Sequence, residues 1–165
     1  MKNAFKEIAS NIHADTNHFY DKTKHYSVHL QMVVDYAEKF IHLIPERDRS
    51  DVYAACWLHD VIEDCRMTYN DVKAISNTLV AELVYALTNE KGRTRKDRGN
   101  GRYYFGINNC PYAPFVKMCD RMANMKYSKD TGSKMYEMYQ KELNGFCDRL
   151  KLERLEEMKV ELYSI

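Results

Sequence analysis

The chain has few of the residues that interrupt helices. Only three prolines and six glycines occur in 165 residues, and four of the glycines lie between residues 92 and 106. Proline and glycine break or weaken helices, so the remaining segments are free to form long ones. Few segments show the strict alternation of apolar and polar residues that is typical of strands. We therefore expect an all-α fold.

An excess of one charge and long apolar runs are also missing. The chain has 25 basic and 24 acidic residues, a formal net charge of +1, which disfavours a nucleic-acid coat or a membrane-surface protein. No uninterrupted apolar stretch approaches the length that spans a bilayer, and residues 1–7 do not read as a secretory leader. We expect a cytoplasmic protein without a membrane or nucleic-acid partner. Self-association as a homo-oligomer is left open.

The cysteines do not form a recognisable framework. There are five, an odd number, and none forms a C-x-x-C pair. This disfavours both a set of disulfides and a zinc knuckle. Reduced thiols are expected.

Apolar residues at three- and four-residue spacing predict the helices. The segments are residues 28–43, a helix from Asp48, Ser50 or Asp51 into the acidic block at 59–64, residues 70–87, a helix from 113 through 125, and the tail from 133 onward. A chain of this length sustains one core. We expect residues 1–165 to form a single domain.

The segment between the third and fourth predicted helices, residues 88–113, loses this spacing. We expect a long surface loop there, with about one turn of helix inside it. Residues 91–102 hold six basic residues and one acidic residue. They form either a solvated basic loop or an electropositive flap that gathers phosphates.

Four ionisable side chains directly follow a run that should be buried. Residues 52–58 are almost entirely apolar, and His59, Asp60, Glu63 and Asp64 come next. In a helix, His59 stands one turn from Glu63 and Asp60 one turn from Asp64. Desolvating these groups is costly unless a cation or partners compensate them. The block indicates a metal site, although Glu63 and Asp64 are also explained as the first solvated residues after the core.

Two further segments give this block its context. His29 opens the first apolar helix, and Asp120 lies on the fourth with Asn124 four residues later. The order His29, His59-Asp60, Asp120 resembles the ligand set of the HD-domain metal-dependent phosphohydrolases. Two imidazoles and two carboxylates suit a divalent ion such as Mn²⁺.

Within that superfamily the chain is most similar to the hydrolases of the alarmone (p)ppGpp, the RelA/SpoT-type hydrolase domain and its small relatives. Residues 55–64 (ACWLHDVIED) resemble that family's A-x-L-H-D-V-x-E-D block. Residues 81–88 and 117–125 resemble two of its helical motifs, and the likeness covers about residues 18–127. It implies an HD-domain helical bundle, with the long basic loop between the third and fourth core helices, that removes the 3′-pyrophosphate of ppGpp with one divalent ion.

The resemblance also implies residue roles. The implied metal ligands are His29, His59, Asp60 and Asp120. The implied catalytic acids are Glu63 and Asp64, and Asn124 is the implied contact to the nucleotide.

The chain departs from this family in one turn. The family's Arg-Lys-Ser/Thr-Gly turn, which holds the guanine base and phosphates, is replaced by residues 20–25 (YDKTKH). Lys22, Lys24 and Arg121 are the candidate contacts to an anionic substrate. The change leaves open a nucleoside 5′-monophosphate phosphatase or other nucleotide phosphohydrolase, and a catalytically silent module that binds a nucleotide or nucleic acid.

The remaining histidines are not part of this ligand set. We expect each of them to be a surface or core residue rather than a ligand of a second metal; they are His13, His18, His25 and His42.

Overall fold

The computed structural model describes residues 2–165. Its elements are α1 (Lys6–Asp15), β1 (Phe19–Tyr20), β2 (Lys24–His25), α2 (Ser27–Phe40), the 3₁₀ turns η1 (Ile41–Leu43) and η2 (Glu46–Asp48), α3 (Arg49–Leu58), α4 (Val61–Asp64), α5 (Tyr69–Ile75), α6 (Thr78–Leu87), α7 (Arg95–Arg98), α8 (Gly101–Asn109), α9 (Ala113–Asp130), α10 (Met135–Asp148) and α11 (Glu156–Ser164). The predicted all-α fold is confirmed. In the described residues the strands form a single antiparallel hairpin in which Phe19 pairs with His25.

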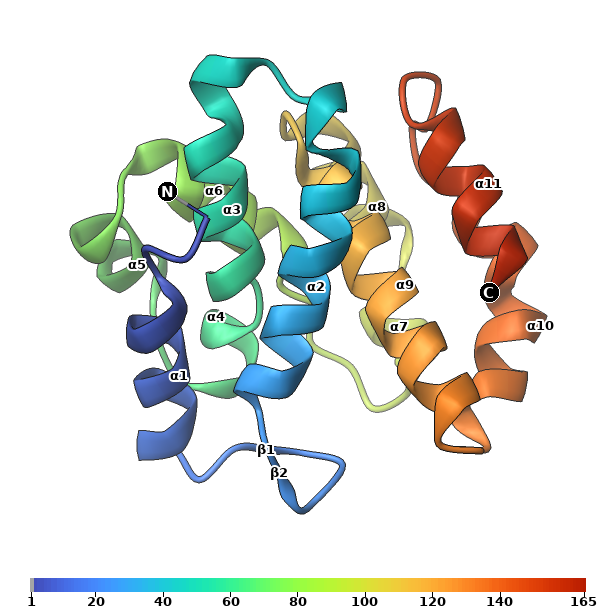
Figure 1. Cartoon of the computed structure of the whole chain (residues 1–165), viewed down its shortest axis with the longest axis horizontal. Helices are drawn as coiled ribbons and strands as arrows, with labels where there is room; N and C mark the ends of the chain where they lie inside the picture. Colours follow the sequence, from blue (N-terminus) through green and yellow to red (C-terminus); the bar gives the residue numbers. More distant parts are fainter. Residues whose placement is uncertain (1) are drawn as a thin grey trace.

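Helices α2, α3 and α9 form the centre of the bundle (Figure 1). Helix α2 packs against both α3 and α9, and α6 also contacts α3 and α9. Helices α10 and α11 pack on α9 and form one flank, while α1 lies against α2, α3 and α4 on the other. The core side chains Leu30, Trp57 and Phe115 are almost completely buried.

The first, second and fourth predicted helices are present close to their expected positions. In α2 the predicted apolar stripe is buried, with Leu30 and Val33 fully inaccessible. The prediction that the second helix runs on into the acidic block was wrong, because α3 ends at Leu58 and the chain turns at residues 59–60 before the separate helix α4. His59 and Asp60 therefore occupy a corner at the end of a buried helix.

Two other predicted helices are divided. The segment 70–87 breaks between α5 and α6, where the Asn77 side chain accepts a hydrogen bond from the Val80 N–H at 3.0 Å and caps α6. The tail forms α10 and α11 with residues 149–155 between them. The sequence did not predict α1, because only Ala9 and His13 of this helix are buried and its apolar stripe is weak.

The basic connection between α6 and α9 contains more helix than expected. Besides the short α7, residues 101–109 form α8, which Asn100 caps by accepting from the N–H groups of Arg102 and Tyr103. Tyr103 and Tyr104 are buried and anchor this helix. The glycines of α8 concealed it from the spacing analysis. No helix within residues 2–165 is both long and apolar enough to cross a membrane.

Candidate metal centre

Three parts of the bundle bring the four predicted metal ligands together. His29 comes from the first turn of α2, His59 and Asp60 from the α3–α4 corner, and Asp120 from the middle of α9. The Nε2 atoms of His29 and His59 are 3.3 Å apart, and Oδ1 of Asp120 lies 3.3 Å from Nε2 of His29. Oδ2 of Asp60 lies 2.9 Å from Nε2 of His59 and 3.8 Å from that of His29. Both imidazoles are almost fully buried.

The donor atoms fit a divalent metal ion. Ligand atoms of His29, His59 and Asp120 all lie within 4.8 Å of one another. Nδ1 of His59 is 2.9 Å from the Cys56 carbonyl oxygen, so it carries a proton and directs Nε2 into the cluster. Nε2 presents its lone pair there once a cation displaces its own proton. Two neutral imidazoles and two carboxylates make a donor set for a borderline or hard cation.

Neighbouring side chains hold both carboxylates in place. The Tyr26 hydroxyl donates to Oδ2 of Asp60 at 2.5 Å. The Lys117 ammonium donates to Oδ2 of Asp120 at 2.9 Å, and the Asn124 amide donates to Oδ1 at 2.6 Å. Hydrogen bonds from these neighbours thus fix the orientation of both predicted carboxylate ligands.

The electrostatics keep these carboxylates ionised. Burial alone would raise the pKa of Asp120, but Lys117 and the two imidazoles hold it well below its usual range. Burial would likewise raise the pKa of Asp60, but His59 lowers it below its usual value. Burial would lower the pKa of His59, but Asp60 and Asp120 raise it to about 10. In the metal-free protein the protonated His59 and Lys117 balance the two carboxylates, and a bound cation would replace the proton on Nε2 of His59.

Glu63 and Asp64 line the same cavity, of about 190 Å³, as Asp60 and Asp120. Glu63 is fixed by Asn89, which donates from its side-chain amide at 2.8 Å and from its backbone N–H at 3.2 Å. Burial, together with the charges of Asp60 and Glu63, raises the pKa of Asp64 to about 7. A carboxyl group with this pKa can exchange a proton near neutral pH.

A larger basic cavity of about 520 Å³ adjoins this one. The two share Arg95, Lys117, Arg121 and Asn89 as lining residues. The larger one is lined by six basic residues and one acidic residue, which are Arg95, Lys96, Arg98, Lys117, Arg121, Arg149 and Glu142. The basic segment before α9 therefore contributes to the wall of a cavity beside the predicted metal ligands.

Helix α10 holds two of these arginines. The Glu142 carboxylate accepts two hydrogen bonds from Arg95, at 2.9 and 3.2 Å, and one from Arg121 at 3.0 Å. Arg121 is itself buried, and its guanidinium lies over the Tyr139 and Phe146 rings at 4.8 and 4.3 Å. The C-terminal region thus forms part of the site.

The predicted substrate contacts differ in position. Arg121 and Asn124 line the metal cavity, but Asn124 uses both ends of its amide within the protein, since its Oδ1 accepts from Tyr20 at 3.0 Å. Lys22 and Lys24 are exposed on the β1–β2 hairpin and line neither cavity. The hairpin residue that reaches the site is Tyr20, whose ring stacks on His29 at 5.0 Å between centroids.

Sequence reasoning did not single out several residues of the site. Lys117 had a readable signal, because it stands three residues before Asp120 on the same helix. Arg95 lies in the basic segment 91–102 already considered as a phosphate-gathering flap, but its pairing with Glu142 had no signal. Tyr26 and Glu142 had none either, since their partners lie 21 to 47 residues away.

No family model matches the chain. It is 25% identical over 76 residues to guanosine-3′,5′-bis(diphosphate) 3′-pyrophosphohydrolase MESH1 of Danio rerio. The match covers 46% of this chain and 42% of that protein. The chain is thus similar to an enzyme named as a pyrophosphohydrolase of a guanosine nucleotide. Its structure also contains a cluster of His and Asp side chains that could hold a metal ion.

Proposed function

We propose that this chain is a divalent-metal-dependent phosphohydrolase that removes the 3′-pyrophosphate of ppGpp. The observation that carries the proposal is the convergence of His29, His59, Asp60 and Asp120 beside a cavity lined by six basic residues. The similarity to MESH1 supports the choice of a guanosine bis(diphosphate) as substrate. We assign the metal as Mn²⁺ because the donor set contains two carboxylates and no thiolate.

In this proposal His29, His59, Asp60 and Asp120 hold the ion. When bound, it lowers the pKa of a coordinated water and polarises a phosphoryl oxygen. Tyr26 and Lys117 keep the two carboxylates oriented through the hydrogen bonds at their Oδ2 atoms.

The two acids that follow the His-Asp pair have separate tasks. Asp64 accepts a proton from the attacking water, a role that suits its raised pKa. Glu63 faces the same cavity with its carboxylate held by Asn89, and it orients the water. The reaction adds this water across the bond between the 3′ oxygen and the adjacent phosphorus, and it releases pyrophosphate and GDP.

The basic cavity binds the rest of the substrate. Arginine forks match phosphate oxygens bidentately, so Arg95, Arg98 and Arg149 suit a ligand with several phosphates. Its volume of about 520 Å³ is in the range of nucleotide-sized ligands. A monophosphate would contact fewer of these basic side chains than a bis(diphosphate).

A second candidate activity is hydrolysis of nucleoside 5′-monophosphates at the same centre. The observation that favours it is the hairpin, which lacks the Arg and Gly of the alarmone-hydrolase turn and carries its lysines outside both cavities.

A nucleotide panel distinguishes the two activities. The protein loaded with Mn²⁺ is incubated with ppGpp, GDP, GMP and deoxynucleoside monophosphates, and the products are identified by mass. We expect pyrophosphate and GDP from ppGpp and no loss of the monophosphates. Release of phosphate from monophosphates with ppGpp left intact would establish the second activity instead. If no nucleotide is consumed, salt-sensitive binding of RNA would favour the silent nucleic-acid-binding module.

A further inference from the structure

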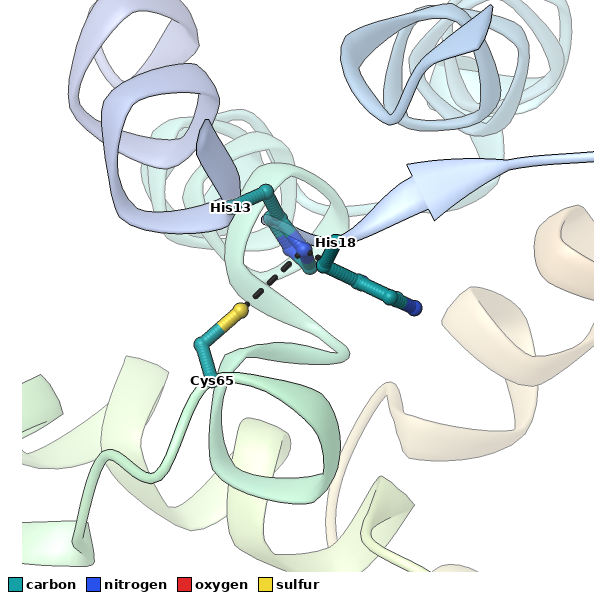
Figure 2. Close-up of side chains that lie close together, drawn as sticks. All are labelled: His13, His18 and Cys65. Carbon is teal, nitrogen blue, oxygen red and sulfur yellow. Dashed lines mark hydrogen bonds between the residues drawn. The ribbon is translucent and has the colours of Figure 1, made fainter. Parts of the chain in front are cut away.

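A second group of side chains that could hold a metal ion lies beside the Tyr26 ring. His13 comes from α1, His18 from the turn that follows it, and Cys65 from the residue directly after α4 (Figure 2). Nδ1 of His13 is 2.9 Å from Nδ1 of His18 and 3.1 Å from Sγ of Cys65. Ligand atoms of all three residues lie within 4.8 Å of one another. His13 and Cys65 are buried, and His18 is half-buried.

Hydrogen bonds alone do not satisfy all the contacts in this cluster. Nδ1 of an imidazole offers either one N–H or one lone pair in the ring plane. If His13 donates to His18, its N–H also faces the Cys65 sulfur. If His13 accepts from the Cys65 thiol, its lone pair is already used and the contact with His18 loses its acceptor. A cation at the centre would instead use one lone pair from each of the three donors.

Nearby contacts resemble the outer shell of a metal site. The other ring nitrogen of His18, Nε2, faces Oδ2 of Asp64 at 3.7 Å, so a carboxylate lies beside this ring on the side away from the cluster. Thr16 places its hydroxyl 3.5 Å from Sγ of Cys65. The His13 ring is also held by stacking on Tyr26 at 4.2 Å between centroids.

We propose that His13, His18 and Cys65 bind a zinc-type divalent ion, as a second site separate from the His29–Asp120 centre. Two imidazoles and one thiolate match the preference of Zn²⁺, with about 2.0–2.1 Å to nitrogen and about 2.3 Å to sulfur, and leave a fourth position for a water. Around a tetrahedral ion such donors stand roughly 3.3–3.6 Å apart. The observed 2.9 and 3.1 Å contacts need to open by only a few tenths of an ångström.

The position of this site gives it a structural role. Its ligands connect α1 and the following turn to the end of α4, the helix that carries Glu63 and Asp64. A bound ion therefore cross-links the N-terminal helix to the acidic block, and through His18 it fixes a neighbour of Asp64. Cys65 is only 6% exposed, which disfavours a role as a nucleophile for substrates.

Cobalt substitution tests the proposal, because only a thiolate ligand gives a sulfur-to-cobalt charge-transfer band in the near ultraviolet. The full chain is stripped with a chelator and titrated with Co²⁺. We expect the band in the wild type and in Asp60→Asn, which alters only the thiolate-free centre. We expect it to disappear in Cys65→Ser and to persist in the matched control Cys110→Ser, whose thiol lies outside the cluster.

A second measurement does not depend on Cys65. His18 is half-buried, so His18→Gln should fold, and it should bind one zinc ion fewer per chain than the wild type by elemental analysis. We expect Zn²⁺ to raise the melting temperature of the Asp60→Asn protein. In the double variant that also carries His18→Gln, this rise should be absent. A wild type without the band, a band that survives in Cys65→Ser, or unchanged zinc content in His18→Gln would overturn the proposal. None of these readouts uses hydrolysis, so they fail or succeed independently of the proposed activity.

Discussion

Tyr26 joins the two histidine clusters through one side chain. Its ring lies 4.2 Å from those of both His13 and His18, and its hydroxyl donates to Asp60. Burial and the neighbouring Asp60 charge raise the pKa of Tyr26 well above its usual value, so the hydroxyl remains a donor. The Tyr26 ring therefore packs against His13 and His18, while its hydroxyl orients a predicted ligand of the His29–Asp120 centre.

Tyr26→Phe keeps the stacked ring and removes only this hydrogen bond. We expect the affinity for Mn²⁺ to fall by about 10- to 100-fold, the usual effect of losing a group that orients a metal ligand. Titration with Mn²⁺, followed by calorimetry, measures it. The control is Tyr53→Phe, which removes a buried tyrosine hydrogen bond to Glu38 away from the site. Equal affinities in Tyr26→Phe and the wild type would refute the role given to this hydroxyl.

Asp64 makes the stability of the metal-free protein depend on pH. Its pKa is about 7 in the folded chain against an ordinary value of 3.8, because burial and the charges of Asp60 and Glu63 disfavour ionisation. Between these two pH values the folded state holds a proton that the unfolded state releases. This contribution to the free energy of unfolding is complete below about pH 4 and is lost as the pH rises to about 7.

Asp64→Asn removes this loss. In the presence of a chelator the variant should be more stable than the wild type at pH 7 by about 1–2 kcal/mol, a figure reduced for screening by water. The difference should vanish near pH 4, where the wild-type carboxyl is protonated. Urea unfolding at the two pH values measures it, with the exposed Asp148→Asn as control. A variant equally stable with the wild type at pH 7 would contradict the assigned burial of this charge.

At the scale of elements, α10 positions the basic wall of the site. Glu142 holds Arg95 and Arg121, although Arg95 belongs to the four-residue helix α7 and Arg121 to α9. The short helix α7 is thereby attached to the bundle at the edge of the metal cavity.

Arg95→Ala removes one charged contact to the proposed substrate. We expect kcat/KM for ppGpp to fall by about tenfold or more, since a hydrogen bond to a charged group contributes about 1.5–3 kcal/mol. Steady-state kinetics with the Mn²⁺-loaded protein measure the effect. Arg93→Ala is the matched control, because Arg93 is exposed and lines neither cavity. Equal losses in both variants would mean that general charge, rather than the position of Arg95, matters.

Helix spacing predicted α2 and α9 because each buries a regular apolar stripe, whereas α3 was predicted from the continuous apolar run 52–58, all of which is buried. Helix spacing failed to predict an element where side-chain capping, aromatic anchoring or low burial determined the local structure. Asn77 interrupts an otherwise continuous stripe by capping α6. The buried tyrosines of α8 form a helix despite Gly101 and Gly106. In α1 too few residues are buried to produce a periodic signal.

The same distinction applies to the site. The local motif at residues 59–64 and the resemblance were enough to predict which ligand side chains converge. The contacts that complete the site join residues far apart in the chain, such as Glu142 with Arg95 and Tyr26 with Asp60. No periodicity or local spacing encodes those pairs. Lys22 and Lys24 were predicted from their charge and from their place in the turn that the resemblance identifies.

At the scale of the whole molecule, metal binding should stabilise the fold. The Asp60 and Asp120 side chains are only 21% and 14% exposed, so a bound cation compensates charge that water reaches poorly. At an Mn²⁺ concentration 100 times the dissociation constant, the free energy of unfolding should rise by about 2.7 kcal/mol. This corresponds to a melting temperature about 5–10 °C higher. Thermal unfolding with Mn²⁺ or chelator measures it, and an unchanged melting temperature would argue against a metal centre.

The central claim is that the four convergent side chains form a hydrolytic metal centre. The most direct test compares pyrophosphate release from ppGpp by the wild type and by Asp60→Asn, each with Mn²⁺, after circular dichroism has shown that both are folded. We expect Mn²⁺-dependent release by the wild type and a loss of at least about a hundredfold in the variant. Equal rates in the two proteins, or release that persists in the wild type with excess chelator, would contradict it.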